Sequence, residues 1–272
     1  MVQLNQQKLL EEVLEIAKNT GEILVSYFEL EHEYNMKPKI GITGYQGDFA
    51  TEADTKAEDY IVDQLRMLRP NDKFVAEENG TYEPESGIEP EYIWYIDPLD
   101  GTINYSRGDS NFAVSIALKR ASDNKIILGV VHAPLLHKTW FSTEELGYSY
   151  VRIKNETHSL PKLTDKRGKV ISLGFGHNLD VTTKIANNIP NIFSRFSSIR
   201  KLGSCAIELC LIADGTYDAH LSSSVYLWDF SAAEIILLNS EKKFRKNSID
   251  GNYRYSLVVS DEEDFDFLNQ IL

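Results

Sequence analysis

The feature that most constrains this chain is a short apolar run that ends in two aspartates. Tyr92–Ile96 has the composition of a buried strand, and Asp97 and Asp100 follow at once in the run Asp-Pro-Leu-Asp-Gly. Asp-Pro and Asp-Gly are common turn dipeptides, so a plain turn is one interpretation. The other is a binding site, because ligands often sit beyond the end of a buried strand. Two carboxylates placed there repel each other, and a hard divalent cation such as Mg²⁺ removes that repulsion.

Two further acidic positions follow the same logic. Glu77 and Glu78 close the apolar run 73–76, which predicts a second strand end, although a solvated charge pair would look the same. Asp229 precedes the apolar segment 230–238, where it could equally be a helix N-cap. The sequence predicts a common site only if these carboxylates converge in space, which spacing alone does not establish.

The N-terminal part of the chain reads as helices followed by strands. Apolar residues at helical spacing predict a helix within 4–30 and another that begins at the capping-box pattern Thr51-x-x-Asp54 and stops before Pro70. A meander of antiparallel strands is predicted for 92–96, 112–118, 126–131 and 138–141. The polar segment 153–168 predicts a domain boundary, which gives an α+β half over 1–152.

The second half, 153–272, alternates strands and helices, which is typical of an α/β arrangement. The segments expected to be strands are 169–173, 217–221 and 257–259. The segments expected to be helices are 181–196, 204–213 and 230–238, the last one opened by Asp229, with a short acidic helix at the C-terminus.

Charge and composition exclude several classes of protein. The 28 Lys+Arg residues face 41 Asp+Glu residues, a net charge of −13, so binding to nucleic acid phosphates is not expected. The two cysteines, Cys205 and Cys210, stand in an apolar stretch and read as buried residues of a reducing compartment. The start of the sequence has no signal-peptide pattern, and no apolar run approaches the roughly 20 residues that cross a bilayer. These observations predict a cytoplasmic protein without a membrane partner.

Four segments then resemble, in order, the signature elements of the inositol monophosphatase family. They are Asp48–Asp54, Ala76–Gly80, Trp94–Tyr105 with the following Phe112–Leu118, and Leu227–Ala233. Together they span residues 48 to 233, so the resemblance covers most of the chain.

The resemblance implies a layered αβαβα sandwich of the inositol monophosphatase and fructose-1,6-bisphosphatase type. It also implies a Mg²⁺-dependent, lithium-sensitive phosphomonoesterase that forms a homodimer and attacks the phosphate in line with a metal-activated water. Two or three Mg²⁺ ions are implied per site, and Mn²⁺ or Ca²⁺ can occupy the same ligands. The implied metal ligands are Glu77, Asp97, the carbonyl of Leu99, Asp100 and Asp229. The residues implied to position and polarise the water are Asp54 and Thr102.

The residues expected to contact the substrate match the family pattern less closely than the metal ligands do. The resemblance implies contacts from the backbone of Gly101 and Thr102 and from the segment Gly203-Ser204-Cys205. Inositol-preferring members carry an acidic residue seven positions before the aspartate of the last element, and here that position is Ser222. A serine supplies no carboxylate for two adjacent hydroxyls. His220 lies nearby, as either a substrate contact or a core residue.

Several functions therefore stay open. The main expectation is hydrolysis of a small phosphate monoester of the inositol monophosphate type. Fructose 1,6-bisphosphate, 3′-phosphoadenosine 5′-phosphate and the 2′-phosphate of NADP are alternative substrates at the same site. A regulatory binding module of the same fold and a purely structural Ca²⁺ site are the alternatives from other classes. The Gly-rich loop 37–48 is hypothesised to close over the site.

Overall fold

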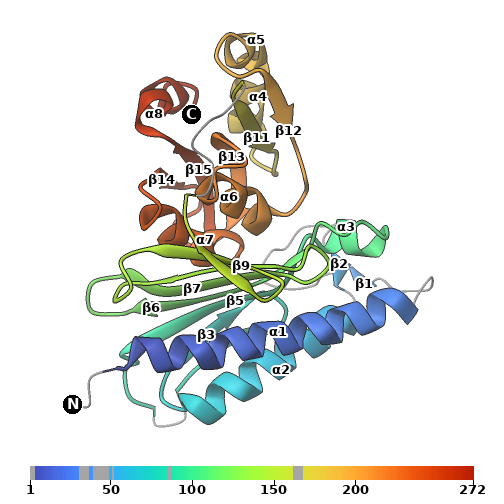
Figure 1. Ribbon diagram of the computed structural model, residues 1–272, viewed down its shortest axis with the longest axis vertical. Coiled ribbons are helices and arrows are strands. Elements are labelled where there is room, and N and C mark those ends of the chain that lie inside the picture. The colour runs from blue at the N-terminus through green and yellow to red at the C-terminus, as the bar shows by residue number, and fades with distance from the viewer. Residues whose placement is uncertain (1–3, 31–36, 39–48, 51, 85–86, 162–167) are drawn as a thin grey trace.

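The structure, a computed structural model, describes residues 4–30, 37–38, 49–50, 52–84, 87–161 and 168–272. Layers of helices and sheets alternate through the molecule, and the two sheets enclose a pair of central helices (Figure 1). This is the αβαβα arrangement that the sequence led us to expect.

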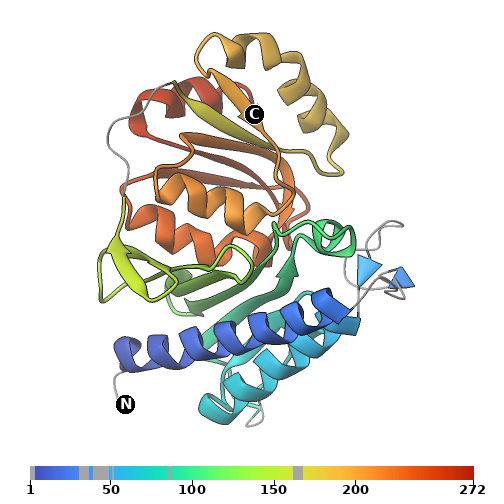
Figure 2. The same ribbon diagram turned by 45° about the vertical axis from the view of Figure 1, so that its right-hand side comes forward.

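The outermost N-terminal layer consists of α1 (Gln6–Leu30) and α2 (Glu52–Leu68), which pack side by side on one face of the first sheet (Figures 1 and 2). Each helix turns one apolar stripe toward the sheet, which explains why the spacing of the apolar residues predicted both helices. The buried members of these stripes include Leu10, Val13, Leu14, Ala17, Ala57, Ile61 and Leu65. Thr51 of the predicted capping box lies outside the described residues, as does most of the loop 37–48. The first two residues of this loop form β1 (Lys37–Pro38), which pairs with β2 (Phe49–Ala50) directly after the loop.

The first sheet has eight strands in the order β10-β9-β8-β7-β6-β5-β3-β4. All neighbours in it are antiparallel except β3 and β5, so the predicted meander is confirmed. The strands are β3 (Lys73–Ala76), β4 (Gly80–Tyr82), β5 (Tyr92–Asp100), β6 (Ala113–Arg120), β7 (Lys125–Ala133), β8 (Lys138–Thr143), β9 (Ser149–Ile153) and β10 (Glu156–Ser159).

The central layer consists of α6 (Cys205–Ala213) and α7 (Leu227–Leu238), which are apolar on nearly all sides because both sheets cover them. Gly129 in β7 allows α7 to approach closely. A Cβ atom at Gly129 would lie 2.2 Å from the carbonyl oxygen of Ala232.

The second sheet has five strands in the order β12-β11-β13-β15-β14, and helices cover its outer face (Figure 2). Its strands are β11 (Val170–Gly174), β12 (Ser198–Arg200), β13 (Ala219–Tyr226), β14 (Lys243–Ser248) and β15 (Arg254–Ser260). The outer helices are α4 (Leu179–Asn187), α5 (Ile189–Phe193) and α8 (Glu262–Asn269).

Three expectations differ from the observed elements. The single helix expected over 181–196 is two helices, because Pro190 has no N–H and its ring obstructs a continuous helix. Asp229 does not open its helix: α7 begins at Leu227, and Asp229 stands in its first turn. The polar segment 153–168 begins with the β9–β10 hairpin, which continues the first sheet to Ser159. The division of the chain at 152/153 stays a prediction.

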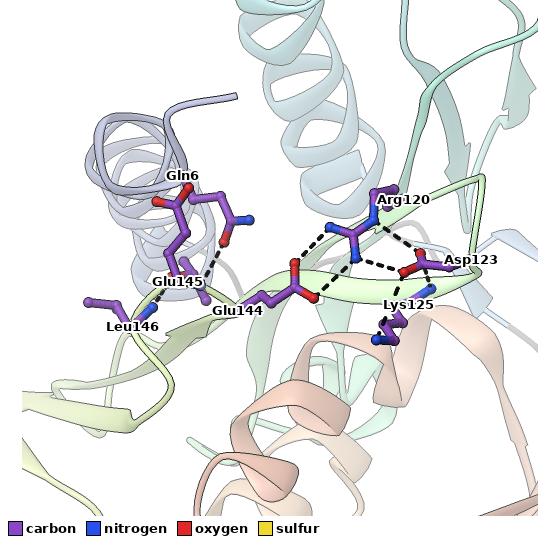
Figure 3. Close-up of polar contacts among 8 residues, drawn as sticks. Gln6, Arg120, Asp123, Lys125, Glu144, Glu145 and Leu146 are labelled. Atoms are coloured by element: carbon purple, nitrogen blue, oxygen red, sulfur yellow. Dashed lines mark hydrogen bonds and ion pairs between the residues drawn. The ribbon is translucent and has the colours of Figure 1, made fainter. Parts of the chain in front are cut away.

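One corner of the first sheet is held by an exposed charge network (Figure 3). The Arg120 guanidinium donates hydrogen bonds to the carboxylates of Asp123 and Glu144, with N–O distances from 2.7 to 3.1 Å. The N–H of Glu145 donates to the side-chain oxygen of Gln6 at 3.1 Å, which ties the start of α1 to the same corner. Among the described residues, none of the helices has the length and apolar content that crossing a membrane requires.

Candidate metal centre and substrate pocket

The two aspartates of the Asp-Pro-Leu-Asp-Gly run lie inside β5 rather than beyond its end. Asp97 pairs with Ser115 of β6 and Asp100 with Ala113, so β5 holds one extra residue between these two pairs. Side chains alternate along a regular strand, and the extra residue of such a bulge brings both aspartates to the same face of the sheet. Both are buried, on the face covered by α6 and α7. The strand is thus locally distorted between the two aspartates.

Three carboxylates converge at this bulge. Oxygen atoms of Glu77, Asp97 and Asp229 all lie within 4.8 Å of one another. Glu77 directly follows β3, the parallel neighbour of β5, and its N–H donates to the Ile96 carbonyl at 3.2 Å. Asp229 comes from α7, where its carboxylate accepts the N–H of Tyr226 at 2.8 Å. The first sheet and the central helix layer therefore build this cluster together.

Asp100 stands beside the cluster and connects it to α6. Its Oδ2 accepts hydrogen bonds from the Ser204 hydroxyl at 2.6 Å and from the Ala206 N–H at 2.7 Å. Burial raises the pKa of Asp100 to about 7, although these two hydrogen bonds act in the opposite direction. Asp100 is not one of the three residues grouped within 4.8 Å.

The donor set fits a hard divalent cation. Burial and the negative charges of Glu77, Asp100 and Asp229 raise the pKa of Asp97 well above its usual range. Close carboxylates of this kind are stable when protonated or when a cation neutralises them, and all-oxygen ligands suit Mg²⁺ or Ca²⁺. The carbonyl of Leu99, also predicted as a ligand, accepts the Thr102 hydroxyl at 3.2 Å. The ligand roles of all five residues stay predictions.

The two predicted catalytic residues come from different elements. Thr102 is the first residue of the short helix α3 (Thr102–Ser106), and Asp54 is buried in the first turn of α2. Gly101, which joins β5 to α3, has a φ of 99°. A Cβ atom there would lie 2.8 Å from the Asn111 carbonyl oxygen, so only glycine fits this turn without strain.

Glu58 is a supporting residue that the motif reasoning missed. It is buried in α2, and its carboxylate accepts the N–H groups of Glu78 at 2.7 Å and Asn79 at 2.8 Å, which fixes the turn that follows Glu77. Burial raises the pKa of Glu58 to about 7. A signal was present in the sequence, because Glu58 follows Asp54 by one helical turn and both therefore face the same side of α2.

A pocket of about 160 Å³ adjoins the carboxylates, and Asp100 and Asp229 form part of its wall. Four predicted substrate residues line it: Gly203, Ser204, Cys205 and Ser222. Gly101 and Thr102 do not belong to its lining. Gly174, Lys201 and Glu208, which the sequence did not indicate, also line the pocket. So does His220, for which the sequence left open a substrate contact or a place in the core. Burial and the nearby carboxylates raise the pKa of the Cys205 thiol well above its usual range, which disfavours the thiolate that a cysteine nucleophile needs.

Comparisons with known proteins point to one family. The sequence matches the profile described as the inositol monophosphatase family over residues 5–240. A Mesorhizobium japonicum protein named inositol-1-monophosphatase is 33% identical over 197 residues, which cover 70% of this chain and 69% of the relative. A Thermotoga maritima protein named fructose-1,6-bisphosphatase/inositol-1-monophosphatase is 33% identical over 198 residues, 72% of this chain and 70% of the relative.

Other relatives carry a different name. The Nus factor SuhB of Escherichia coli strain K12 is 27% identical over 224 residues, 81% of this chain and 78% of the relative. The crystal structure of the extragenic suppressor protein suhB from Bartonella henselae superposes with a TM-score of 0.79 at 22% identity, covering 97% of this chain and 98% of that one. This structural likeness shows the fold.

Proposed function

The chain belongs to the inositol monophosphatase family of phosphatases, and from this premise we propose that it hydrolyses a small phosphate monoester of the inositol monophosphate type with Mg²⁺ as cofactor. The observation that carries the proposal is the convergence of Glu77, Asp97 and Asp229 beside a pocket. Phosphoryl transfer depends mainly on neutralised charge and a well-placed nucleophile, and this arrangement can supply both.

In the proposed site Glu77, Asp97, the Leu99 carbonyl, Asp100 and Asp229 would hold the cations. When bound there, Mg²⁺ would supply positive charge to the phosphate and would acidify a water molecule. The protein supplies the positioning. The Asp100 carboxylate is fixed by its hydrogen bonds to Ser204 and Ala206, so one of its oxygens is held in place before any cation arrives.

The attack itself relies on Thr102 and Asp54, the two residues predicted to be catalytic. In the proposed mechanism the Thr102 hydroxyl and the Asp54 carboxylate orient a water that attacks phosphorus in line with the leaving alcohol oxygen. The P–O bond to that alcohol breaks, and inorganic phosphate and the free alcohol are released. The N–H groups of Gly101 and Thr102 face the phosphate oxygens in this arrangement. Two or three cations per site, a homodimer, lithium sensitivity and a cytoplasmic location belong to the same proposal.

A second substrate class is favoured by two pocket residues. Ser222 stands where inositol-preferring members carry a carboxylate, and Lys201 lines the same pocket. Compared with a pocket that has a carboxylate at this position, a pocket with a serine and a lysine carries less negative charge. Such a pocket favours a substrate with a second phosphate. The Thermotoga relative, whose name includes fructose-1,6-bisphosphatase, agrees with this alternative.

The test is phosphate release with Mg²⁺ from inositol 1-phosphate, fructose 1,6-bisphosphate, NADP and 3′-phosphoadenosine 5′-phosphate, repeated with EDTA. We expect Mg²⁺-dependent release, with inositol 1-phosphate as the preferred substrate. Preference for a bisphosphate or a nucleotide would support the second class. Absence of release from all four substrates would contradict the phosphatase and favour the regulatory binding module, while metal binding without turnover would favour a structural Ca²⁺ site.

A further inference from the structure

Two buried polar atoms in the pocket wall are without a hydrogen-bond partner among the described residues. They are Nε2 of His220 and Oγ of Ser222, and neither is exposed to solvent. The two residues are 1% and 0% exposed. Leaving such groups unsatisfied costs free energy, and a ligand that completes their hydrogen bonding recovers it.

The strand geometry brings these two groups together. His220 and Ser222 are two residues apart in β13, so their side chains lie on the same face, and both residues line the pocket that Asp100 and Asp229 adjoin. Leu221, between them, points to the opposite face and packs in the outer core.

Gly174 of β11 packs directly against this pair, because it is the register partner of Ser222. A Cβ atom at Gly174 would lie 2.6 Å from the Ser222 Oγ and 3.5 Å from the His220 Cε1. Any other residue at position 174 would therefore displace the Ser222 hydroxyl. Gly174 also lines the pocket, so glycine keeps this part of the wall free of a side chain.

The other side of the His220 ring is held by two partners. Nδ1 lies 2.8 Å from the Ser172 Oγ and 3.3 Å from a carboxylate oxygen of Glu208. A carboxylate can only accept, so the ring proton of neutral His220 belongs on Nδ1 and Nε2 is left as an acceptor. Glu208 also accepts the N–H groups of Leu202 and Gly203, which fixes it relative to the pocket.

We propose that His220 determines substrate specificity: its Nε2, together with the Ser222 hydroxyl, hydrogen-bonds a hydroxyl group on the organic part of the phosphate ester. Nε2 accepts the substrate O–H, and the serine hydroxyl can both donate and accept, so the pair suits a polyol or a ribose. This inference rests on the proposed phosphatase activity and names a recognition element for it. Glu208 and Ser172 act as positioning residues for the ring.

Two substitutions of His220 test the roles of Nδ1 and Nε2 separately. In His220→Asn the amide nitrogen takes the place of the Nδ1 donor and nothing replaces Nε2, whereas in His220→Gln the side-chain amide reaches the position of Nε2, where its oxygen can accept a hydrogen bond. KM and kcat are measured for inositol 1-phosphate and for p-nitrophenyl phosphate, whose organic part has no hydroxyl. His132→Gln is the matched control, because His132 is a histidine on β7 outside the proposed pocket.

We expect His220→Asn to raise the KM for inositol 1-phosphate by about tenfold, the effect of one hydrogen bond, and to leave p-nitrophenyl phosphate within about twofold. Ser222→Ala should act in the same direction, and His220→Gln and His132→Gln should stay near the wild type. All variants should unfold in one cooperative transition, and their Mg²⁺ affinity by calorimetry should equal that of the wild type.

The inference is overturned if His220→Asn behaves as the wild type and His220→Gln is impaired on both substrates, since the ring would then act only through Nδ1. Equal losses on both substrates in His220→Asn overturn it as well. Absence of phosphate release from both substrates by the wild-type protein overturns the proposed function and this inference with it.

Discussion

The carboxylates of the candidate centre are held in place by the chain at the cost of electrostatic repulsion. Asp97 and Asp100 are both buried, and burial together with neighbouring negative charge raises both pKa values. Their groups therefore retain protons in the native state at pH values where the unfolded chain has lost them. A divalent cation competes with those protons for the same oxygen atoms.

This competition predicts how the stability of the protein depends on pH. The native pKa of Asp100 is about 7 and its ordinary value is 3.8, so the native state binds more protons across that interval. The free energy of unfolding of metal-free protein should therefore fall as the pH rises from about 4 to about 7. A fixed concentration of Mg²⁺ should raise the melting temperature more at pH 8 than at pH 5, because fewer protons compete. Thermal unfolding with Mg²⁺ and with EDTA checks this, and an equal shift at both pH values would contradict it.

At the residue scale, the sequence predicted the acids of the cluster but not their supports. The cluster residues stand in short motifs that can be identified by their resemblance to the family. Glu58 and Glu208 stand in otherwise ordinary helices, and their roles depend on which backbone N–H groups the fold brings to them. Helical spacing indicates the face on which such a carboxylate lies, but not which backbone N–H groups outside the helix it will accept.

At the scale of elements, one close approach between β7 and α7 fixes the central layer. Gly129 leaves no room for a side chain against the Ala232 carbonyl, and Ser115 of the neighbouring β6 donates a hydrogen bond to the Trp228 carbonyl at 3.0 Å. Trp228 immediately precedes Asp229, so the same contact between sheet and helix also sets the position of this carboxylate.

Gly129→Ala should therefore displace α7. Because the added methyl group meets backbone atoms rather than a flexible side chain, we expect the free energy of unfolding to fall by about 1–3 kcal/mol. Arg120→Gln is the control, since it removes exposed ion pairs of the same sheet that are worth at most about 1 kcal/mol (Figure 3). Urea unfolding followed by tryptophan fluorescence measures both. Equal stability of Gly129→Ala and the wild type would show that α7 does not depend on this contact.

Elements with a strong apolar period were predictable, and those defined by tertiary pairing were not. The stripes of α1 and α2 and the alternation along β6 follow from the sequence alone. β14 was missed because Lys243–Ser248 is a polar edge strand that reads as a loop. The bulge in β5 was missed because it is defined by the register with β6.

At the scale of the whole molecule, the candidate site exists only where the layers meet. Asp97 comes from the first sheet, Glu77 from the turn that follows its strand β3, and Asp229 from the central helix layer. Asp100 is bonded to the start of α6, which belongs to the same layer (Figure 2). Motif spacing indicated each part, and the folded arrangement of the layers shows that the parts converge.

The most direct test of this account is phosphate release by Asp97→Asn, with Asp63→Asn at an exposed position of α2 as the control. Asparagine keeps the shape of the side chain and removes the charge, so the metal-free variant should be at least as stable as the wild type. Loss of a direct ligand should lower Mg²⁺-dependent phosphate release by more than about 100-fold, the upper end of what loss of an outer-shell group costs. Release at the wild-type rate from a folded Asp97→Asn protein would contradict the assignment of the cluster as the catalytic metal centre.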